Sequence, residues 1–127
     1  MRIRTLVILI FLFFVATTTW AAPAMRIVVA ATDQTPAAAV SNNAGPSPYF
    51  LVFDQKGKLV ETLTNPYKEA DSAGPKVVTF LAGKGATVVV AGDFGPRLVE
   101  IMKSKGITAL SFKGSVQDAV KKALQPK

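Results

Sequence analysis

The stretch Ala86-Thr-Val-Val-Val-Ala-Gly-Asp-Phe-Gly-Pro-Arg-Leu-Val-Glu-Ile-Met-Lys-Ser-Lys-Gly106 decides the fold of this chain. Its apolar run Val88–Ala91 is typical of a short strand that is buried on both faces. The residues at 92–95 interrupt this run, and Pro96 then suits the first position of a helix, where its missing N–H needs no partner. The pattern therefore predicts a strand, a tight turn and a helix, a geometry that exposes backbone N–H groups above the turn.

The first 24 residues have the pattern of an export signal. Arg2 and Arg4 precede an apolar block at 6–15, and residues 22–24 supply the small side chains of a signal-peptidase site. This block is short, because a helix that crosses a membrane needs about 20 apolar residues. We expect a signal peptide at 1–24, a mature domain at 25–127, a periplasmic or secreted location and no membrane association after cleavage. An uncleaved anchor helix is the alternative.

Two residue types are absent from the whole sequence, cysteine and histidine. An exported domain without cysteine depends on its hydrophobic core rather than on disulfides. The lack of histidine excludes Ser-His-Asp and Cys-His catalysis and the common zinc sites. Removal of Arg2 and Arg4 lowers the formal net charge from +7 to +5, and the remaining lysines form no run. We therefore expect no nucleic-acid partner.

The remaining mature chain predicts elements on both sides of the central stretch. Strands are expected at 25–33, 49–54, 59–64 and 107–112, with a hairpin turn at 55–58 and a loop at 34–48. One helix is expected after a cap at Asp71 or Ser72, and the last one after a cap at Ser115. The resulting order β-β-β-α-β-α-β-α predicts one three-layer α/β domain with a mixed sheet.

Several short segments, taken in order and at their spacings, resemble one protein family. They are Pro48–Asp54, Asn65-Pro66, Val89–Gly92, Gly95-Pro96-Arg97 and Gly114-Ser115-Val116. Together they resemble the dinitrogenase iron–molybdenum cofactor biosynthesis family, whose members include carriers of nitrogenase cofactor precursors. The resemblance covers nearly the whole mature chain and implies a ribonuclease-H-like fold with a five-stranded mixed sheet. It also implies a small carrier, not an enzyme, for a metal-containing or anionic ligand such as an iron-containing cluster; a divalent cation is the other candidate. Together with the export signal, it leads us to expect a small exported carrier.

The chain departs from the family pattern where the family usually has metal ligands. A His-Phe-Gly-Arg-like segment is usual before the strand at Tyr49, but this chain has Asn-Ala-Gly-Pro at 43–46. The middle loop, which often carries a histidine near glycines, has Ser-Ala-Gly at 72–74. Thiolate and imidazole are the ligands that suit iron–sulfur clusters. The chain thus resembles a member that has kept the scaffold without the usual ligands.

The candidate ligand site lies over the turn at 92–97 and the loop at 41–48. Arg97 is expected to clamp an anionic group beside the helix N-terminus, or else to form a structural tie to the loop at 41–48 or to Asp93. Phe94 is expected to cover a ligand or to pack under the loop, and the serines and asparagines of the loop are equally explained by turn chemistry. The predicted ligand-binding residues are Ser41, Asn42, Asn43, Ser47, Gly92, Asp93, Phe94, Gly95 and Arg97.

Asp33 and Asp93 form a candidate metal site. In a ribonuclease-H-like sheet the first strand lies beside the fourth, so both carboxylates are expected at adjacent carboxyl ends, where they would hold Mg²⁺ or Ca²⁺. The alternative is that Asp33 binds loop backbone and Asp93 caps the following helix. Two other functions remain open: a divalent-metal-dependent phosphoester hydrolase that uses this pair, and a protein–protein interaction module without a small ligand. The oligomeric state is open as well.

Overall fold

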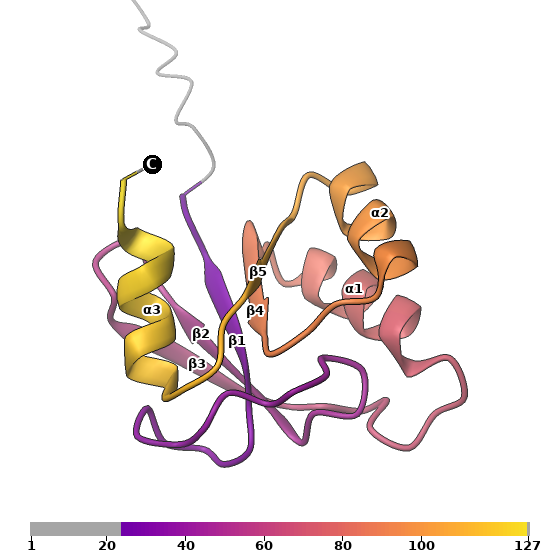
Figure 1. Ribbon diagram of the computed structural model, residues 1–127, viewed down its shortest axis with the longest axis horizontal. Coiled ribbons are helices and arrows are strands. Elements are labelled where there is room, and N and C mark those ends of the chain that lie inside the picture. Colours follow the sequence, from indigo (N-terminus) through magenta and orange to yellow (C-terminus); the bar gives the residue numbers. More distant parts are fainter. Residues whose placement is uncertain (1–23, 127) are drawn as a thin grey trace, which may run out of the picture.

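Five strands and three helices follow one another in the predicted order in the computed structural model, which describes residues 24–126 (Figure 1). The predicted signal peptide therefore lies outside the described residues except for its last position, and it stays a prediction. The elements are β1 (Ile27–Ala31), β2 (Tyr49–Phe53), β3 (Leu59–Thr64), α1 (Ala73–Gly83), β4 (Val88–Ala91), α2 (Pro96–Ser104), β5 (Thr108–Ser111) and α3 (Val116–Leu124).

The strands form one mixed sheet in the order β3-β2-β1-β4-β5. β1 pairs antiparallel with β2 and parallel with β4, so it occupies the centre, and all five of its residues are buried. β3 is an edge strand, paired antiparallel with β2 alone, and its outward-facing residues are exposed as its mixed pattern predicts. The expected five-stranded mixed sheet, with the first strand beside the fourth, is confirmed.

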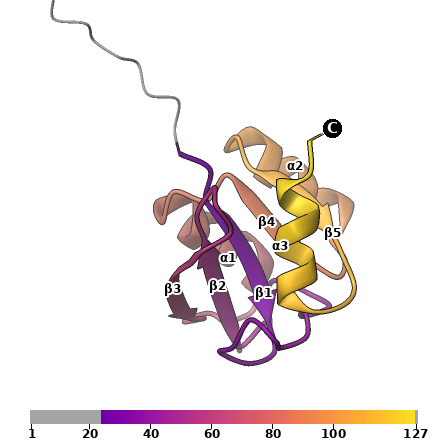
Figure 2. The ribbon, with the colours of Figure 1, turned by 90° about the vertical axis from the view of Figure 1, so that its left-hand side faces the viewer.

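The helices cover the two faces of this sheet unequally. α1 and α2 lie on one face and α3 on the other (Figures 1 and 2). Because side chains alternate along a strand, β1 contributes Val28 to the core beneath α1 and α2, and Val29 to the core beneath α3. Each face has its own buried cluster, which confirms the three-layer arrangement.

The helix ends agree with the sequence patterns in two of the three helices. α2 begins at Pro96, and Gly106 follows its last turn with φ = 73°. Ser115 caps α3, because its Oγ accepts the backbone N–H of Asp118 at 3.2 Å. The capping prediction for α1 is wrong: Ser72 occupies the N-cap position, so Asp71 does not, and Ser72 makes no side-chain cap because its backbone is left-handed at φ = 55°.

Within residues 24–126, no helix combines the length and the apolar character that crossing a membrane requires.

Candidate functional site

The turn after β4 is paired with a segment of the loop that follows β1. The N–H of Gly92 donates to the carbonyl of Ser41 at 2.8 Å, and that of Asp93 donates to the carbonyl of Asn42 at 2.7 Å. On its other side, the N–H of Ser41 donates to the carbonyl of Ala30 at 2.8 Å. The segment 41–43 therefore runs between the diverging ends of β1 and β4. The loop predicted at 34–48 thus contains a short extended piece that its turn-rich composition did not predict.

Gly92 permits this close approach. A Cβ built on Gly92 would lie 2.9 Å from both the Cα and the Oδ1 of Asn42, closer than real Cβ atoms come to other atoms. At the far end of the loop, a Cβ on Gly45 would lie 3.0 Å from the backbone N of Gly74, at the start of α1. The loop is therefore held against the β4 turn at one end and against the first turn of α1 at the other.

Ser41 and Ser47, two of the predicted ligand-binding residues, are buried at 6% and 2% exposure. The Ser47 hydroxyl lies 2.9 Å from the Ser41 hydroxyl and 2.9 Å from the carbonyl oxygen of Tyr49. In this arrangement their side chains face into the domain and stabilise the loop from beneath rather than facing an incoming ligand.

Asn65 fixes the loop from the other side, and the sequence interpretation did not include it in the site. Its buried side-chain amide donates to the carbonyls of Gly45 at 2.8 Å and Ser47 at 2.9 Å, while its Oδ1 accepts the N–H of Tyr67 at 2.8 Å. The available signal was the Asn65-Pro66 dipeptide, which helped to carry the family resemblance. The structural role of Asn65 is to give these buried carbonyls their hydrogen-bond donors.

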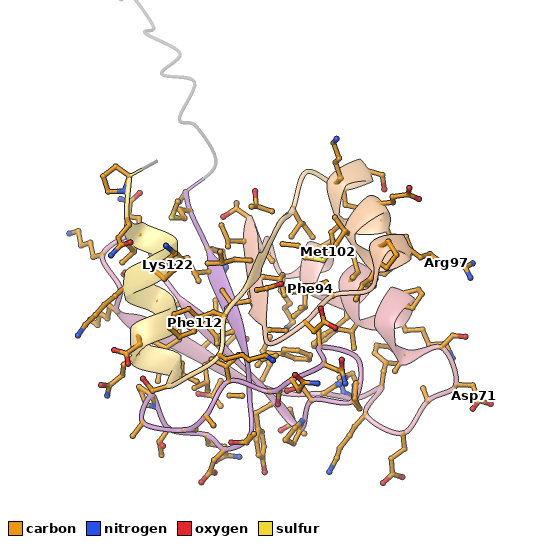
Figure 3. All side chains as sticks on the ribbon, in the orientation of Figure 1. Asp71, Phe94, Arg97, Met102, Phe112 and Lys122 are labelled. Carbon is orange, nitrogen blue, oxygen red and sulfur yellow. The ribbon has the colours of Figure 1, made fainter. Side chains whose placement is uncertain are left out.

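The other predicted site residues lie at the surface or partly beneath it. Asn42, Asn43 and Asp93 are exposed, and Asn43 forms a parallel bridge with Asp93. Phe94 is half-buried and packs against the core beneath α1 and α2 (Figure 3).

Two hollows flank the turn. The first, which we name the loop hollow, has a volume of about 480 Å³ and lies between the loop after β1 and the segment before α3. Its lining residues are Ala37, Ala39, Val40, Asn42, Gly92, Lys113, Gly114 and Ser115. The second, which we name the helix hollow, has a volume of about 370 Å³ and lies between the first turns of α1 and α2. Its lining residues are Ser72, Gly74, Pro75, Gly95, Arg97, Leu98 and Ile101.

The hydrogen bonds of the turn decide which hollow has backbone donors available. The N–H groups of Gly92 and Asp93 are occupied by the loop, and that of Phe94 donates to the Oδ1 of Asp93 at 2.9 Å. Within residues 24–126, the N–H groups of Gly95 and Arg97 have no hydrogen-bond acceptor in the protein. Both residues line the helix hollow, so the donors available to a ligand are on that side of the turn.

Arg97 adds a positive charge at the same place. Its side chain is exposed and extends away from α2 into solvent (Figure 3). In the described part of the chain, the ion pairs are those of Glu61 with Arg26 and with Lys84, so Arg97 has no acidic partner. The expected tie between Arg97 and Asp93 is therefore not formed.

Asp33 and Asp93 each bind a local backbone amide. The Oδ1 of Asp33 accepts the N–H of Gln34 at 2.7 Å, which agrees with the loop alternative, whereas Gly95 rather than Asp93 occupies the N-cap of α2. The backbone of Ser41 and Asn42 lies between the two strand ends that were expected to bring the carboxylates together. Among the described residues there is no group of three or more His, Cys, Asp or Glu side chains that could hold a metal ion. The metal role of this pair stays a prediction.

The domain is similar to known proteins. The apo form of the orange protein from Desulfovibrio gigas superposes with a TM-score of 0.72 at 28% sequence identity, covering 81% of this chain and 90% of that chain. The NMR structure of a putative NifB protein from Thermotoga superposes with a TM-score of 0.64 at 28% identity, covering 76% of this chain and 84% of that chain. A family model described as dinitrogenase iron-molybdenum cofactor matches residues 25–126. No curated protein sequence matches the chain.

Proposed function

The chain belongs to the dinitrogenase iron-molybdenum cofactor family, and we propose that it is a non-enzymatic carrier that holds a small anionic or metal-containing ligand at the helix hollow. The family relation supports the carrier class, and the geometry of the turn supports the position of the ligand.

One observation carries this proposal: two helix N-termini meet at one hollow with an arginine that has no acidic partner within residues 24–126. The first turns of α1 and α2 both line it, together with Arg97. The helix dipole at each N-terminus, and the N–H groups of Gly95 and Arg97 that have no acceptor among the described residues, favour negative charge. The guanidinium of Arg97 adds charge-assisted hydrogen bonds of the kind that anions with several oxygen or sulfur atoms accept.

The chemistry of the available side chains restricts how a metal-containing ligand would be held. Neither cysteine nor histidine occurs in the sequence, and Asp93 is bound to its own loop. The chain therefore does not fit direct coordination of a bare iron cluster. The ligand would have to bring its own inner ligands and be bound as an anion, through hydrogen bonds and charge.

Export belongs to this proposal. The export signal expected at 1–24 would place the carrier in the periplasm or outside the cell, where it would hold its ligand away from the cytoplasm.

The experiment is purification of the mature protein from its native compartment without oxygen, followed by metal analysis and native mass spectrometry. We expect a stoichiometric mass above that of the polypeptide, lost in an Arg97→Ala variant purified in parallel. A native protein with no retained mass and no metal would overturn the carrier function.

A further inference from the structure

Among residues 24–126, no strand pairs with the outer edge of β5. β5 pairs in parallel with β4. The N–H of Thr108 donates to the carbonyl of Thr87, just before β4, and the N–H of Phe112 donates to the carbonyl of Ala91 in β4, each at 2.9 Å. Because hydrogen-bonding direction alternates along a strand, the N–H and C=O groups of Ala109 and Ser111 point away from the sheet. β5 ends the strand order on this side (Figure 2). Two residues there offer backbone donors and acceptors for an additional strand.

The two edges of the sheet differ in how they are protected. The β3 edge carries Glu61, which is paired with Arg26 at 3.2 Å and with Lys84 at 3.8 Å, and its pairing with β2 has a register irregularity. Charged residues and irregular pairing are the usual means by which proteins block edge-to-edge association. β5 has neither charge nor proline among its four residues, Thr108–Ser111, and its pairing with β4 is regular.

A groove lies beside this edge, on the face of the sheet that carries α3. It has a volume of about 470 Å³, and most of its lining is apolar. Thr108 and Leu110 of β5 form one wall, and Lys122 of α3 lies on the other (Figure 3). The full lining is Met25, Val88, Thr108, Leu110, Lys122, Ala123, Gln125 and Pro126. A strand added to β5 would place alternate side chains over this groove.

The charges around the edge distinguish between two occupants. Exposed Lys105 precedes β5 and exposed Lys113 follows it. If a second copy of the chain paired antiparallel with β5, the Lys105 end of one strand would lie beside the Lys113 end of the other, and such a juxtaposition of like charges is unfavourable. An extended peptide with acidic residues at both ends would instead meet a lysine at each end. The charge pattern therefore favours such a peptide over a second copy.

We propose that β5 binds, by strand addition, an extended segment of another protein that has apolar residues at alternate positions and acidic residues at its ends. Main-chain hydrogen bonds to Ala109 and Ser111 supply affinity, the groove selects the apolar side chains, and Lys105, Lys113 and Lys122 select acidic ends. This surface is separate from the helix hollow, so the proposal stands independently of the carrier function.

The test uses a synthetic peptide, acetyl-Glu-Glu-Val-Thr-Val-Thr-Val-Glu-Glu-amide, added to the isotope-labelled mature protein. NMR measures the rate of amide hydrogen exchange at Ala109 and Ser111, which is expected to slow at least tenfold when the peptide is saturating. The exchange rate of the Leu110 amide, which is already hydrogen-bonded to β4, is expected to change less. A matched peptide with lysine in place of each glutamate is expected to bind at least tenfold more weakly. Equal binding of both peptides, or no change at Ala109 and Ser111, overturns the proposal.

Two variants connect the result to the edge itself. Ser111→Pro removes an outward-facing donor at an edge position, where proline is tolerated, and is expected to abolish peptide binding with the circular dichroism spectrum unchanged. The double change Lys105→Glu with Lys113→Glu is expected to reverse the preference between the two peptides. If the proline variant unfolds, this reversal is the test of binding at the β5 edge.

The matched control for the double change is Lys68→Glu with Lys76→Glu. It changes the net charge equally at a distance from β5 and is expected to retain the preference. A concentration-dependent dimer that protects Ala109 without peptide overturns the proposal in favour of a second copy.

Discussion

The backbone N–H of Asp93 donates a 2.7 Å hydrogen bond to the carbonyl oxygen of Asn42. Together with the bond from Gly92 to Ser41, it occupies the first donors of the turn that the sequence pattern presents as free. The N–H of Phe94 is also occupied, by the Oδ1 of Asp93, so the interpretation of the turn as an open row of donors is wrong at its first three positions. The donors that remain available belong to Gly95 and Arg97, two residues that line the helix hollow, and this moves the candidate site toward α1 and α2.

Gly92→Ala is expected to destabilise the domain by about 1–3 kcal/mol, because its new Cβ would collide with the backbone of Asn42. Urea denaturation measures the loss. Gly95→Ala is the matched control: it lies in the same turn, at φ = −65°, with nothing within 4 Å of its Cβ position. A control variant that loses as much stability as Gly92→Ala would contradict the assigned close contact.

Asn65→Ala is expected to cost about 1–3 kcal/mol, because it leaves the carbonyls of Gly45 and Ser47 without their donors. Loss of the loop anchor should also speed amide exchange across 41–48, which hydrogen-exchange mass spectrometry detects. Asn43→Ala removes an exposed amide from the same loop and should stay within about 0.5 kcal/mol of the parent. Unchanged exchange in the Asn65 variant would show that other contacts hold the loop.

The fold was predictable because local pattern and global arrangement agree along most of the chain. The apolar run of β4, the Pro96 start of α2 and the Ser115 cap each specify their element within a few residues. α1 is the exception at its start, because Ser72 adopts a left-handed backbone and makes no cap. Its capping sequence is a local preference that the tertiary structure overrides.

The turn beside the candidate site was predictable from the sequence, but its hydrogen bonds and the side on which its free donors lie were not. The glycine turn at 92–95 marks the place, since a break between a buried strand and a helix is visible in the sequence. The pairing of residues 41–43 with that turn is not visible, because backbone hydrogen bonds between distant segments leave no periodic pattern of side chains. Asn65 was missed for a related reason: its role is to satisfy carbonyls about 20 residues away.

Ser72→Gly is expected to stabilise the domain by about 0.5–1 kcal/mol, because glycine adopts φ = 55° without the strain that a Cβ imposes. Thermal denaturation with chemical denaturation as a check measures the gain. Ser72→Ala, which keeps the strain and removes a hydroxyl that makes no cap, should be close to neutral. A glycine variant no more stable than the alanine variant would contradict the strain.

Asp54 is expected to make the hairpin between β2 and β3 sensitive to acid. The N–H of Lys58 donates to its Oδ1 at 3.0 Å and that of Lys56 at 2.9 Å, and these bonds hold the pKa of Asp54 below its ordinary value. A lowered pKa stabilises the fold above the unfolded value of about 3.9, and this contribution is lost as the pH falls through the folded pKa. NMR titration of the Asp54 carboxyl checks the direction. Asp54→Asn keeps an acceptor but does not titrate, so its unfolding free energy should fall less than that of the parent on acidification from pH 5 to pH 3.

Arg97→Ala is expected to weaken binding of a small oxyanion about 10- to 100-fold, because a hydrogen bond to a charged group contributes about 1.5–3 kcal/mol. Isothermal titration calorimetry at low salt measures the binding of two probes, molybdate and inorganic phosphate. The affinity of the parent protein for them should fall as ionic strength rises. Arg97→Lys keeps the charge without the planar guanidinium, so its affinity for the oxyanion should lie between those of the parent and the alanine variant.

Lys103→Ala is the matched control, since it removes one positive charge from the last turn of the same helix, away from the hollow. Because Arg97 is exposed and has no acidic partner in the described chain, its removal should leave stability unchanged. Equally weakened binding in both alanine variants would mean that Arg97 contributes only its net charge. Unchanged binding in both would contradict an anion site at the helix hollow.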